Sequence, residues 1–306
     1  MTVRGRVLLA TGETMAMVCP VTAEPVAGAE LFRIDAGGAE SNVAAHVAAL
    51  GHPARWFSRL GDDPLGRRVA DQLAARGVDV STVVFDADHR TGLYVKDPGR
   101  GVHYYRDGSA ASHLSPADAD AVGLGDVALV QVSGITAALG GTAPAFLDRL
   151  MSRAAAAGIP VSFDVNHRAA LWPAATAAPV LEALSRRADI VFVGRDEAEV
   201  LWGTTAAASV RARFAATPEL IVKDGEVGAT VFLGEQEVFS ASPKVDVVEA
   251  VGAGDAFAGG YLAAHLAGAG VAERITAGHA RAALTLQTTG DSIDVAAHPT
   301  SESEPT

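Results

Sequence analysis

The sequence has almost no cysteine, few aromatic residues and no long uninterrupted apolar run. Cys19 is the only cysteine among 306 residues, which excludes an intrachain disulfide and any zinc site built from several cysteines. Aromatic residues make up 6% of the chain, so a core must be built mainly from Ala, Val and Leu. The apolar stretch over 256–272 is interrupted and too short to span a bilayer. The first residues carry no cationic segment followed by an apolar stretch, so we expect no secretion signal. These absences predict a cytoplasmic protein without a membrane partner.

Positive charge is also in short supply. The chain has 24 Lys and Arg against 36 Asp and Glu, a formal net charge of -12. This balance disfavours nucleic acid and acidic membrane surfaces as partners. It leaves a small anionic substrate open, because a pocket needs only one or two local cations to bind an anion.

Two common nucleotide-binding motifs are absent. The chain contains no Gly-Lys pair, which excludes the GxxxxGK[ST] loop of Walker-type nucleotide-binding proteins. It also contains no GxGxxG, which argues against the dinucleotide-binding fingerprint. Any phosphate site must therefore be built on another pattern.

From about residue 120 onward, short apolar runs alternate with Ala-rich helical stretches. The runs are typical of strands covered by helices on both faces, which predicts an α/β fold with a doubly wound, mostly parallel sheet. Polar residues follow several of these strands, where ligands bind in such sheets. They are Ser133, Asp164, Asn166 and Lys223. Expected strands cover 127–130, 160–164, 189–193 and 220–223, and expected helices cover 143–157, 174–187 and 197–201.

The N-terminal third has a different pattern. Short segments that favour β structure lie among ordinary helices, which suggests a small β lid added to the main sheet. We expect one α/β domain over 1–297, with lid excursions near 12–35 and 90–108. The Pro-, Ser- and Glu-rich stretch 298–306 is expected to be a disordered tail.

The most informative segment is a glycine-rich loop that opens an Ala-rich helix. It contains Gly252, Ala253, Gly254 and Asp255, and the helix follows at once. Backbone amides at such a helix start suit a phosphate, and they keep a neighbouring Asp able to accept a proton from an alcohol. Phosphoryl transfer needs mainly alignment and charge stabilisation, which these residues can supply.

A second glycine motif lies near the N-terminus and opens another helix. Gly38 would let a substrate approach the backbone closely, and Asn42 can both donate to and accept from sugar hydroxyls. Gly51 and Gly61 follow at set distances.

Taken together, the two glycine motifs resemble those of the ribokinase-like (PfkB-type) carbohydrate kinases, over roughly residues 6–292. The resemblance implies a doubly wound domain with a β lid, and Mg-ATP as the phosphoryl donor. It makes Asp255 the catalytic base and the amides of 252–254 an anion hole. It also assigns Lys223 and Gly225 to nucleotide binding.

Within this family the segments are most similar to the kinases of 2-keto-3-deoxygluconate, which phosphorylate its terminal hydroxyl. The residues that this resemblance places against the keto acid are Gly38, Tyr94, Tyr104, Arg106, Ile135 and Arg168. The chemistry is consistent, because a carboxylate is bound well by an Arg fork. Arg106 lies in the expected lid and Arg168 follows a strand, so lid closure could bring both onto one sugar acid.

The chain departs from the family pattern at two places near the expected phosphate site. Glu249 stands where the family has Asp, which puts activation by a monovalent cation in doubt. Gly194 replaces the usual Asn or Ser, while Glu197 is retained and could orient Mg²⁺ through water.

Two other functions stay open at this point. One is a fructokinase or another neutral-sugar kinase of the same family, favoured if Arg106 and Arg168 point away from the pocket. The other is a catalytically silent sugar- or nucleotide-binding regulator, which the intact Gly252, Gly254 and Asp255 argue against. Because an exposed lid edge invites strand pairing between subunits, we also expect a homo-oligomer, a dimer or larger.

Overall fold

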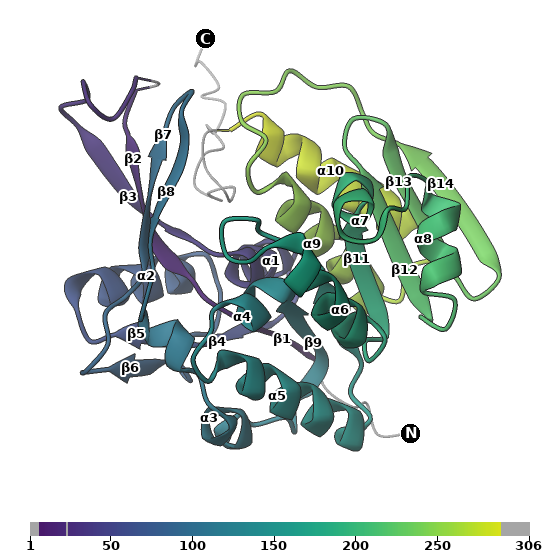
Figure 1. The fold of residues 1–306 in the computed structure, drawn as a ribbon, viewed down its shortest axis with the longest axis horizontal. Helices are drawn as coiled ribbons and strands as arrows, with labels where there is room; N and C mark the ends of the chain where they lie inside the picture. The colour runs from purple at the N-terminus through teal and green to yellow at the C-terminus, as the bar shows by residue number, and fades with distance from the viewer. Residues whose placement is uncertain (1–5, 23, 289–306) are drawn as a thin grey trace, which may run out of the picture.

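A computed structural model describes residues 6–22 and 24–288. Its centre is an eight-stranded sheet with the order β14-β13-β12-β11-β10-β9-β1-β4 (Figure 1). Pairing is parallel from β4 through β12, and β13 and β14 are added antiparallel at one edge. The strands are β1 Val7–Thr11, β4 Ala54–Phe57, β9 Val127–Ser133, β10 Val161–Asp164, β11 Ile190–Gly194, β12 Glu219–Asp224, β13 Gly228–Leu233 and β14 Gln236–Ala241.

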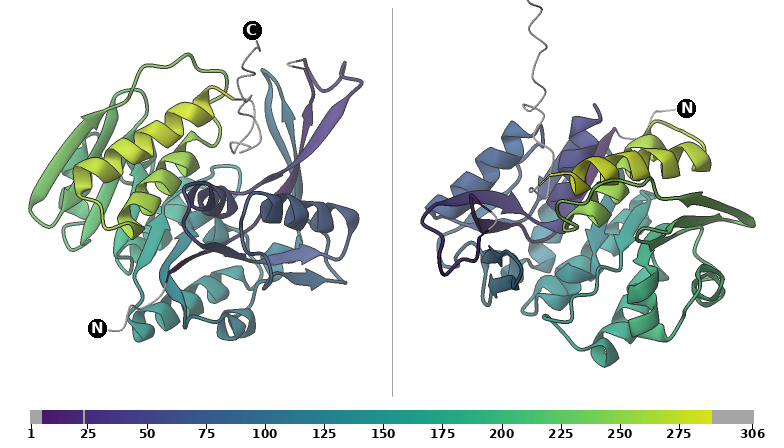
Figure 2. Two further views of the ribbon diagram at one scale, coloured as in Figure 1. Left: turned by 180° about the vertical axis from the view of Figure 1, so that it is seen from behind. Right: turned by 90° about the horizontal axis from the view of Figure 1, so that it is seen from above.

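Helices cover both faces of this sheet, so the prediction of a doubly wound, mostly parallel α/β fold is confirmed (Figure 2). One face packs against α3 Pro116–Ala121, α4 Gly134–Ala138, α5 Ala143–Ala157, α6 Ala174–Ser185, α7 Arg195–Trp202 and α8 Ala207–Arg213. The other packs against α1 Ala39–Ala49, α2 Pro64–Ala75, α9 Ala253–Leu266 and α10 Val271–Leu286.

The alternation of strand side chains explains why two cores form. Successive residues of a strand point to opposite faces, and Leu8 and Leu9 of β1 lie in different clusters of buried residues. Phe192 and Val193 of β11 divide in the same way. The central strands therefore carry apolar residues that face both sides, as the sequence predicts for a sheet buried on both sides.

A second sheet stands over one edge of the first and forms the lid. Its order is β3-β2-β7-β8, from β2 Met15–Pro20, β3 Phe32–Gly37, β7 Leu93–Asp97 and β8 Gly101–Tyr105. Figure 1 shows these strands projecting away from the main sheet, opposite α9 and α10. A short parallel pair, β5 Arg59–Gly61 with β6 Val84–Asp86, and a 3-10 helix, Ala110–His113, complete the elements near the base of the lid.

Several elements were not expected from the sequence. The hairpin of β13 and β14, the β5–β6 pair, α8 and α10 lie in segments to which we assigned no element. β14 alternates exposed and half-buried residues, so its apolar signal is weak compared with that of the central strands. The expected tail over 298–306 and the end of the expected domain lie outside the described residues. Among the described residues, no helix has the length and apolar character needed to cross a bilayer.

Candidate active site

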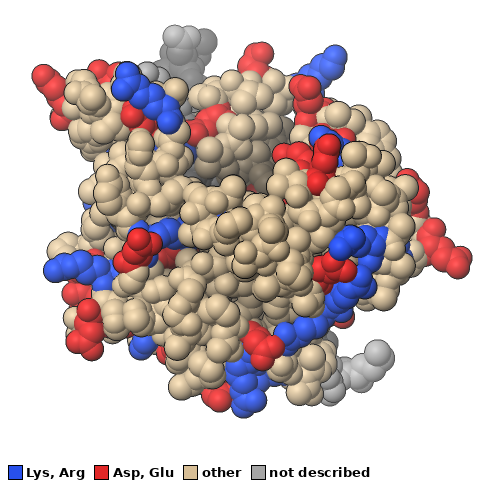
Figure 3. Space-filling view, viewed as in Figure 1, with Lys and Arg blue, Asp and Glu red and all other residues tan. Residues whose placement is uncertain are grey.

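The lid and the carboxyl ends of the parallel strands enclose a cavity of about 570 Å³. Figure 3 shows this face of the molecule hollowed between the lid and the half that carries α7 and β13, with acidic and basic side chains scattered around it. All seven residues that we predicted to bind substrate line the cavity, as do Asp255, Gly252, Gly254, Lys223 and Glu197. Residues far apart in the sequence therefore meet in one chamber.

Asp255 projects into this cavity from the first turn of α9. Gly252 precedes the helix at φ +85°, a left-handed conformation that a side chain would oppose. The Asn42 amide, Nδ2, donates a hydrogen bond of 2.9 Å to Asp255 Oδ2. Burial raises the pKa of Asp255 to about 6, although the Asn42 hydrogen bond and the charge of Arg168 both act to lower it. Asp255 is therefore a carboxylate that can accept a proton near neutral pH.

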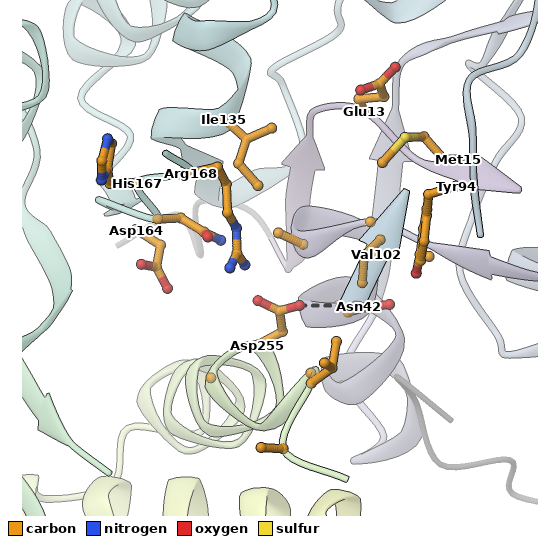
Figure 4. A pocket seen from close by; sticks show the side chains of 18 of the residues that line it. Glu13, Met15, Asn42, Tyr94, Val102, Ile135, Asp164, His167, Arg168 and Asp255 are labelled. Carbon is orange, nitrogen blue, oxygen red and sulfur yellow. Dashed lines mark hydrogen bonds between the residues drawn. The ribbon is translucent and has the colours of Figure 1, made fainter. Parts of the chain in front are cut away.

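Asn42 donates a hydrogen bond to this acid, and the charge of Arg168 acts on it. Asn42 was predicted to contact sugar hydroxyls, and the structure additionally ties it to Asp255, so it also orients that carboxylate. Arg168 follows β10 on the loop that contains Asn166, the one non-glycine residue with positive φ in the described part of the chain. In Figure 4 the Arg168 guanidinium extends toward Asp255 across the cavity.

The lid contributes an aromatic and glycine-lined wall. The rings of Tyr94 and Tyr104 lie 5.8 Å apart, and both line the cavity. Gly38 is required for a reason that the sequence did not reveal. A Cβ at this position would lie 2.5 Å from the Glu13 carbonyl oxygen, so a side chain would push the base of the lid away from α1.

Arg106 lines the cavity but is already paired with an acid. Its guanidinium donates to the buried carboxylate of Glu13, which also accepts a hydrogen bond of 2.5 Å from the Ser109 hydroxyl. Sequence reasoning missed Glu13, although its position after an apolar strand was a usable signal. The pair balances the charge of Arg106 and fixes its orientation beside the substrate space.

The far end of the cavity opens toward a second one. Lys223, at the end of β12, forms an ion pair of 2.8 Å with Asp164, at the end of β10. Burial lowers the pKa of Lys223, but the charge and hydrogen bond of Asp164 outweigh it, and that pKa lies above its usual value. Lys223, Ala250 and Gly254 line both cavities, so they form the wall across which the two spaces meet.

This second cavity has a volume of about 860 Å³ and a mostly apolar lining. Gly225 and Ala253 lie in it rather than in the first cavity. Its apolar walls come from β13, α9 and α10 and the loop before α9, and include Val227, Val245, Phe257, Ala282, Ala283 and Leu286. The shape and lining suit a flat heterocycle whose phosphate tail would point to Gly254 and Lys223.

Glu197 has a structural role that we did not predict. Its carboxylate accepts from the backbone amide of His167 and, at 3.1 Å, from that of Gly194, which closes the start of α7. Burial first, and then the charge of Asp164, raises the pKa of Glu197 to about 7. Two carboxyls that repel one another beside a phosphate space fit a hydrated Mg²⁺, which takes few protein ligands. The described residues contain no cluster of three or more ligating side chains.

Glu40 is a further buried acid that the sequence analysis did not single out. It accepts a hydrogen bond of 2.6 Å from Ser133 and lies against Gly12, where a Cβ would be 2.2 Å from its carboxyl carbon. Burial raises the pKa of Glu40 to about 7, and the charge of Asp255 adds to the effect. The strand-end hydroxyl of Ser133 thus serves Glu40 rather than the cavity.

Comparison with known proteins supports a shared family. The sequence profile of the pfkB family carbohydrate kinases matches residues 7–297. The chain is 35% identical to 2-dehydro-3-deoxygalactonokinase of Haloferax volcanii, covering 93% of this chain and 92% of that one. It is 33% identical to 2-dehydro-3-deoxygluconokinase of Thermoproteus tenax, covering 93% and 89%.

Solved structures agree with the sequence comparison. The crystal structure of 2-dehydro-3-deoxygluconokinase from Thermotoga maritima superposes with a TM-score of 0.87 at 26% identity, covering 95% of each chain. The match spans both the main sheet and the lid because it covers nearly the whole of both proteins. This chain belongs to the PfkB family of carbohydrate kinases and is a sugar kinase with a ribokinase-like fold.

Proposed function

We propose that this kinase transfers the γ-phosphoryl group of ATP to the terminal hydroxyl of 2-keto-3-deoxygluconate or its C4 epimer. The observation that carries the proposal is one cavity that holds a carboxylate base, Asp255, and two arginines, Arg106 and Arg168. Relatives similar over nearly the whole chain bear the names of kinases for these two sugar acids. A neutral sugar has no group that needs an arginine fork.

The chemistry follows from the positions of the side chains. Asp255 accepts the proton of the sugar hydroxyl as that oxygen forms its bond to the γ-phosphorus, and the bond to the β-phosphate oxygen breaks to release ADP. The backbone amides of 252–254, at the start of α9, face the charge that develops on the transferred group. Lys223, held by Asp164 where the two cavities meet, supplies a fixed cation beside it.

The sugar is held on the lid side and the nucleotide on the other. Tyr94, Tyr104 and Arg106 enclose the substrate from the lid, and the second cavity takes the adenosine with Gly225 at its edge. Mg²⁺ bound to the phosphates would neutralise their charge, with Glu197 and Asp164 orienting its water ligands. We place the reaction in the cytoplasm, where ATP is available.

The proposal also includes a dimer or larger assembly formed through the lid. β3 and β8 are the edges of the lid sheet, and edge strands offer unpaired backbone groups to a second copy. Leu31 and Tyr105 near these edges are 71% and 64% exposed, which adds apolar surface to such a contact. Light scattering on the eluting protein tests this directly, and a monomer at all concentrations would exclude it.

The test of substrate is coupled ADP release from Mg-ATP with a panel of sugars. The panel contains 2-keto-3-deoxygluconate, its galactonate epimer, gluconate, fructose and ribose, with Asp255→Asn as the blank. We expect turnover confined to the keto-deoxy acids and abolished in the blank. A preference for fructose or ribose would refute the carboxylate assignment and leave the kinase in place.

Arginine variants sharpen the result. Arg106→Met should raise KM for the acid about tenfold or more, because the substrate carboxylate loses one of its two arginines and the Glu13 carboxylate loses its counter-charge. Arg149→Met is the matched control, since Arg149 pairs with Asp120 on the exposed surface and lies outside the cavity. An unchanged KM in Arg106→Met would show that the carboxylate is bound elsewhere.

A further inference from the structure

One ion pair joins the lid to the segment that leads into the phosphate loop. Lys96 lies in lid strand β7, and its Nζ is 3.3 Å from Glu249 Oε2. Glu249 stands three residues before Gly252, which opens the loop. The side chain of Lys96 is 6% exposed and that of Glu249 is 27% exposed, so the pair is largely shielded from solvent. It bridges two elements that face each other across the sugar cavity.

The lid presents Lys96 to the cavity side. Residues two apart in a strand share a face, and Lys96 follows Tyr94 by two in β7. Both side chains are buried and both line the cavity. An ammonium group loses its hydration when it is covered in this way and needs an acid close by to compensate. Glu249 supplies that charge only when the lid lies over the loop.

Glu249 is in turn fixed to the body of the enzyme. The backbone amides of Val248 and Glu249 donate to the carbonyl of Leu286 at the end of α10, at 2.8 and 3.3 Å. The following residues, Ala250 and Val251, line the sugar cavity before the chain turns at Gly252. The position of the Glu249 side chain therefore affects a short segment that is hydrogen-bonded to α10 at one end and continues into the phosphate loop.

We propose that Lys96 and Glu249 form a latch that holds the lid closed over the bound sugar and sets the phosphate loop for transfer. Neither side chain is a catalytic residue, since neither touches the reacting atoms in this assignment. They are positioning residues, which act through Gly252, Gly254 and Asp255. The inference depends on the sugar kinase activity of the family and not on the identity of the sugar.

The latch makes a specific kinetic prediction. A lid that closes poorly should lower kcat/KM for the sugar and admit water to the phosphoryl group while the sugar is bound, which raises the share of ATP that is hydrolysed instead of used for transfer. We expect Lys96→Met and Glu249→Gln each to lower kcat/KM by about tenfold and to raise the ratio of hydrolysis to transfer by a similar factor. Because both substitutions break the same contact, the double variant should be no worse than the poorer single one.

The experiment measures ADP release and sugar phosphate formation in the same reactions, with sugar present, for the two single variants and the double variant. The sugar is whichever member of the panel the wild type turns over, so a wrong substrate assignment does not affect the outcome. Asp148→Asn is the matched control, because Asp148 forms an ion pair of 2.6 Å with Arg187 on the exposed surface. We expect it to keep kcat/KM and the hydrolysis ratio within twofold of the wild type.

Variants that retain the charges distinguish positioning from folding. Lys96→Arg and Glu249→Asp keep an ion pair possible, and at least one of them should restore the low hydrolysis ratio, with thermal unfolding followed for every protein. Multiplying effects in the double variant would overturn the latch, as would single variants within twofold of wild type. An unchanged hydrolysis ratio in a folded variant with reduced kcat/KM would also overturn it.

Discussion

Glu40, Glu197 and Asp255 around the cavity have different partners from the acids at the opposite edge of the main sheet. Two other acids of the cavity, Glu13 and Asp164, pair with Arg106 and Lys223. Around the cavity, Glu40, Glu197 and Asp255 are held mainly by hydroxyls, backbone amides and the amide of Asn42. Burial is the largest influence on each of them and raises all three pKa values, to about 7, 7 and 6.

At the opposite edge, where the parallel strands begin, acids pair with arginine. Arg55 lies 2.8 Å from Asp126 and 2.8 Å from Asp79. The hydrogen bond from Arg55 holds the pKa of Asp126 below its ordinary value. Burial acts to raise the pKa of Asp79, but Arg55 and Ser81 outweigh it and the pKa is lowered.

The comparison shows which surroundings give an acid the pKa that a general base needs. An acid with a close arginine stays ionised at all physiological pH values and accepts a proton poorly. An acid that is buried with neutral donors changes its protonation near neutral pH, which is what a general base requires. Glu40, Glu197 and Asp255 are therefore costly to ionise, and the acids of the opposite edge are not.

The largest effect is expected from removing the base. Asp255→Asn keeps the shape of the side chain but cannot accept the hydroxyl proton, so kcat should fall by about 10³-fold or more. The measurement is coupled ADP release, with ATP binding and thermal unfolding as checks on the fold. Residual turnover within tenfold of wild type would show that another group takes the proton.

Next comes the cation beside the transferred group. Lys223→Met removes the charge that Asp164 holds where the cavities meet, and kcat should fall by about 10²-fold. Lys244→Met is the matched control, because Lys244 lines the second cavity but is exposed. If both variants lose activity equally, Lys223 serves nucleotide binding in general and not transfer.

The pH profile tests the raised pKa of the base directly. Because Asp255 must be ionised to accept a proton, kcat/KM should rise as pH increases through about 6. The hydrogen bond from Asn42 lowers the pKa of Asp255, so Asn42→Ala should move this acidic limb to higher pH. If the acidic limb of the pH profile does not move in Asn42→Ala, the limb reports the titration of a group other than Asp255.

A smaller effect is expected on stability from Glu40. Its folded pKa of about 7 lies above the ordinary 4.5, so its contribution to stability is fully present below pH 4.5 and is lost as pH rises to about 7. Glu40→Gln should remove this loss. Its free energy of unfolding at pH 8 should exceed that of the wild type by on the order of 3 kcal/mol. Denaturant unfolding at pH 5 and pH 8 measures it, and an unchanged pH dependence would contradict the assignment.

The smallest effect is expected at the opposite edge. Asp79 and Asp126 have lowered pKa values, so the stability that they contribute with Arg55 is present at neutral pH and is lost as pH falls. Their side chains are 40% and 53% exposed, and solvent screening limits the cost of Arg55→Met to about 1 kcal/mol. Denaturant unfolding should show Arg55→Met to be less stable than the wild type at pH 7 but not at pH 3. The kcat of the variant at neutral pH should be unchanged.

Much of the fold could be predicted because its signals are local. The segment 143–157 was expected to be helical and forms α5, and the apolar run at 189–193 forms β11 with a shift of one residue. The start of α3 also has a local signal, since Ser115 precedes Pro116 and its hydroxyl accepts from the amide of Asp118. The two glycine motifs likewise indicated the family before any contact was known.

The contacts that tune the site could not be predicted in the same way. Asn42 and Asp255 are separated by 213 residues, and Glu13 and Arg106 by 93, so no spacing pattern joins them. A sequence shows that an acid is present but not how much water it keeps, and burial is what raises the pKa of Asp255 and Glu40. The roles of the individual residues in binding stay predictions until the variants are measured.

The second cavity and the lid are built from different parts of the chain. Every residue that lines the second cavity lies between 223 and 286, whereas the lid that covers the first cavity is built from the N-terminal third. Changes in the lid that alter the choice of sugar can therefore leave the lining of the second cavity unchanged. Related enzymes can in this way differ in their sugar substrate and keep the same phosphoryl donor.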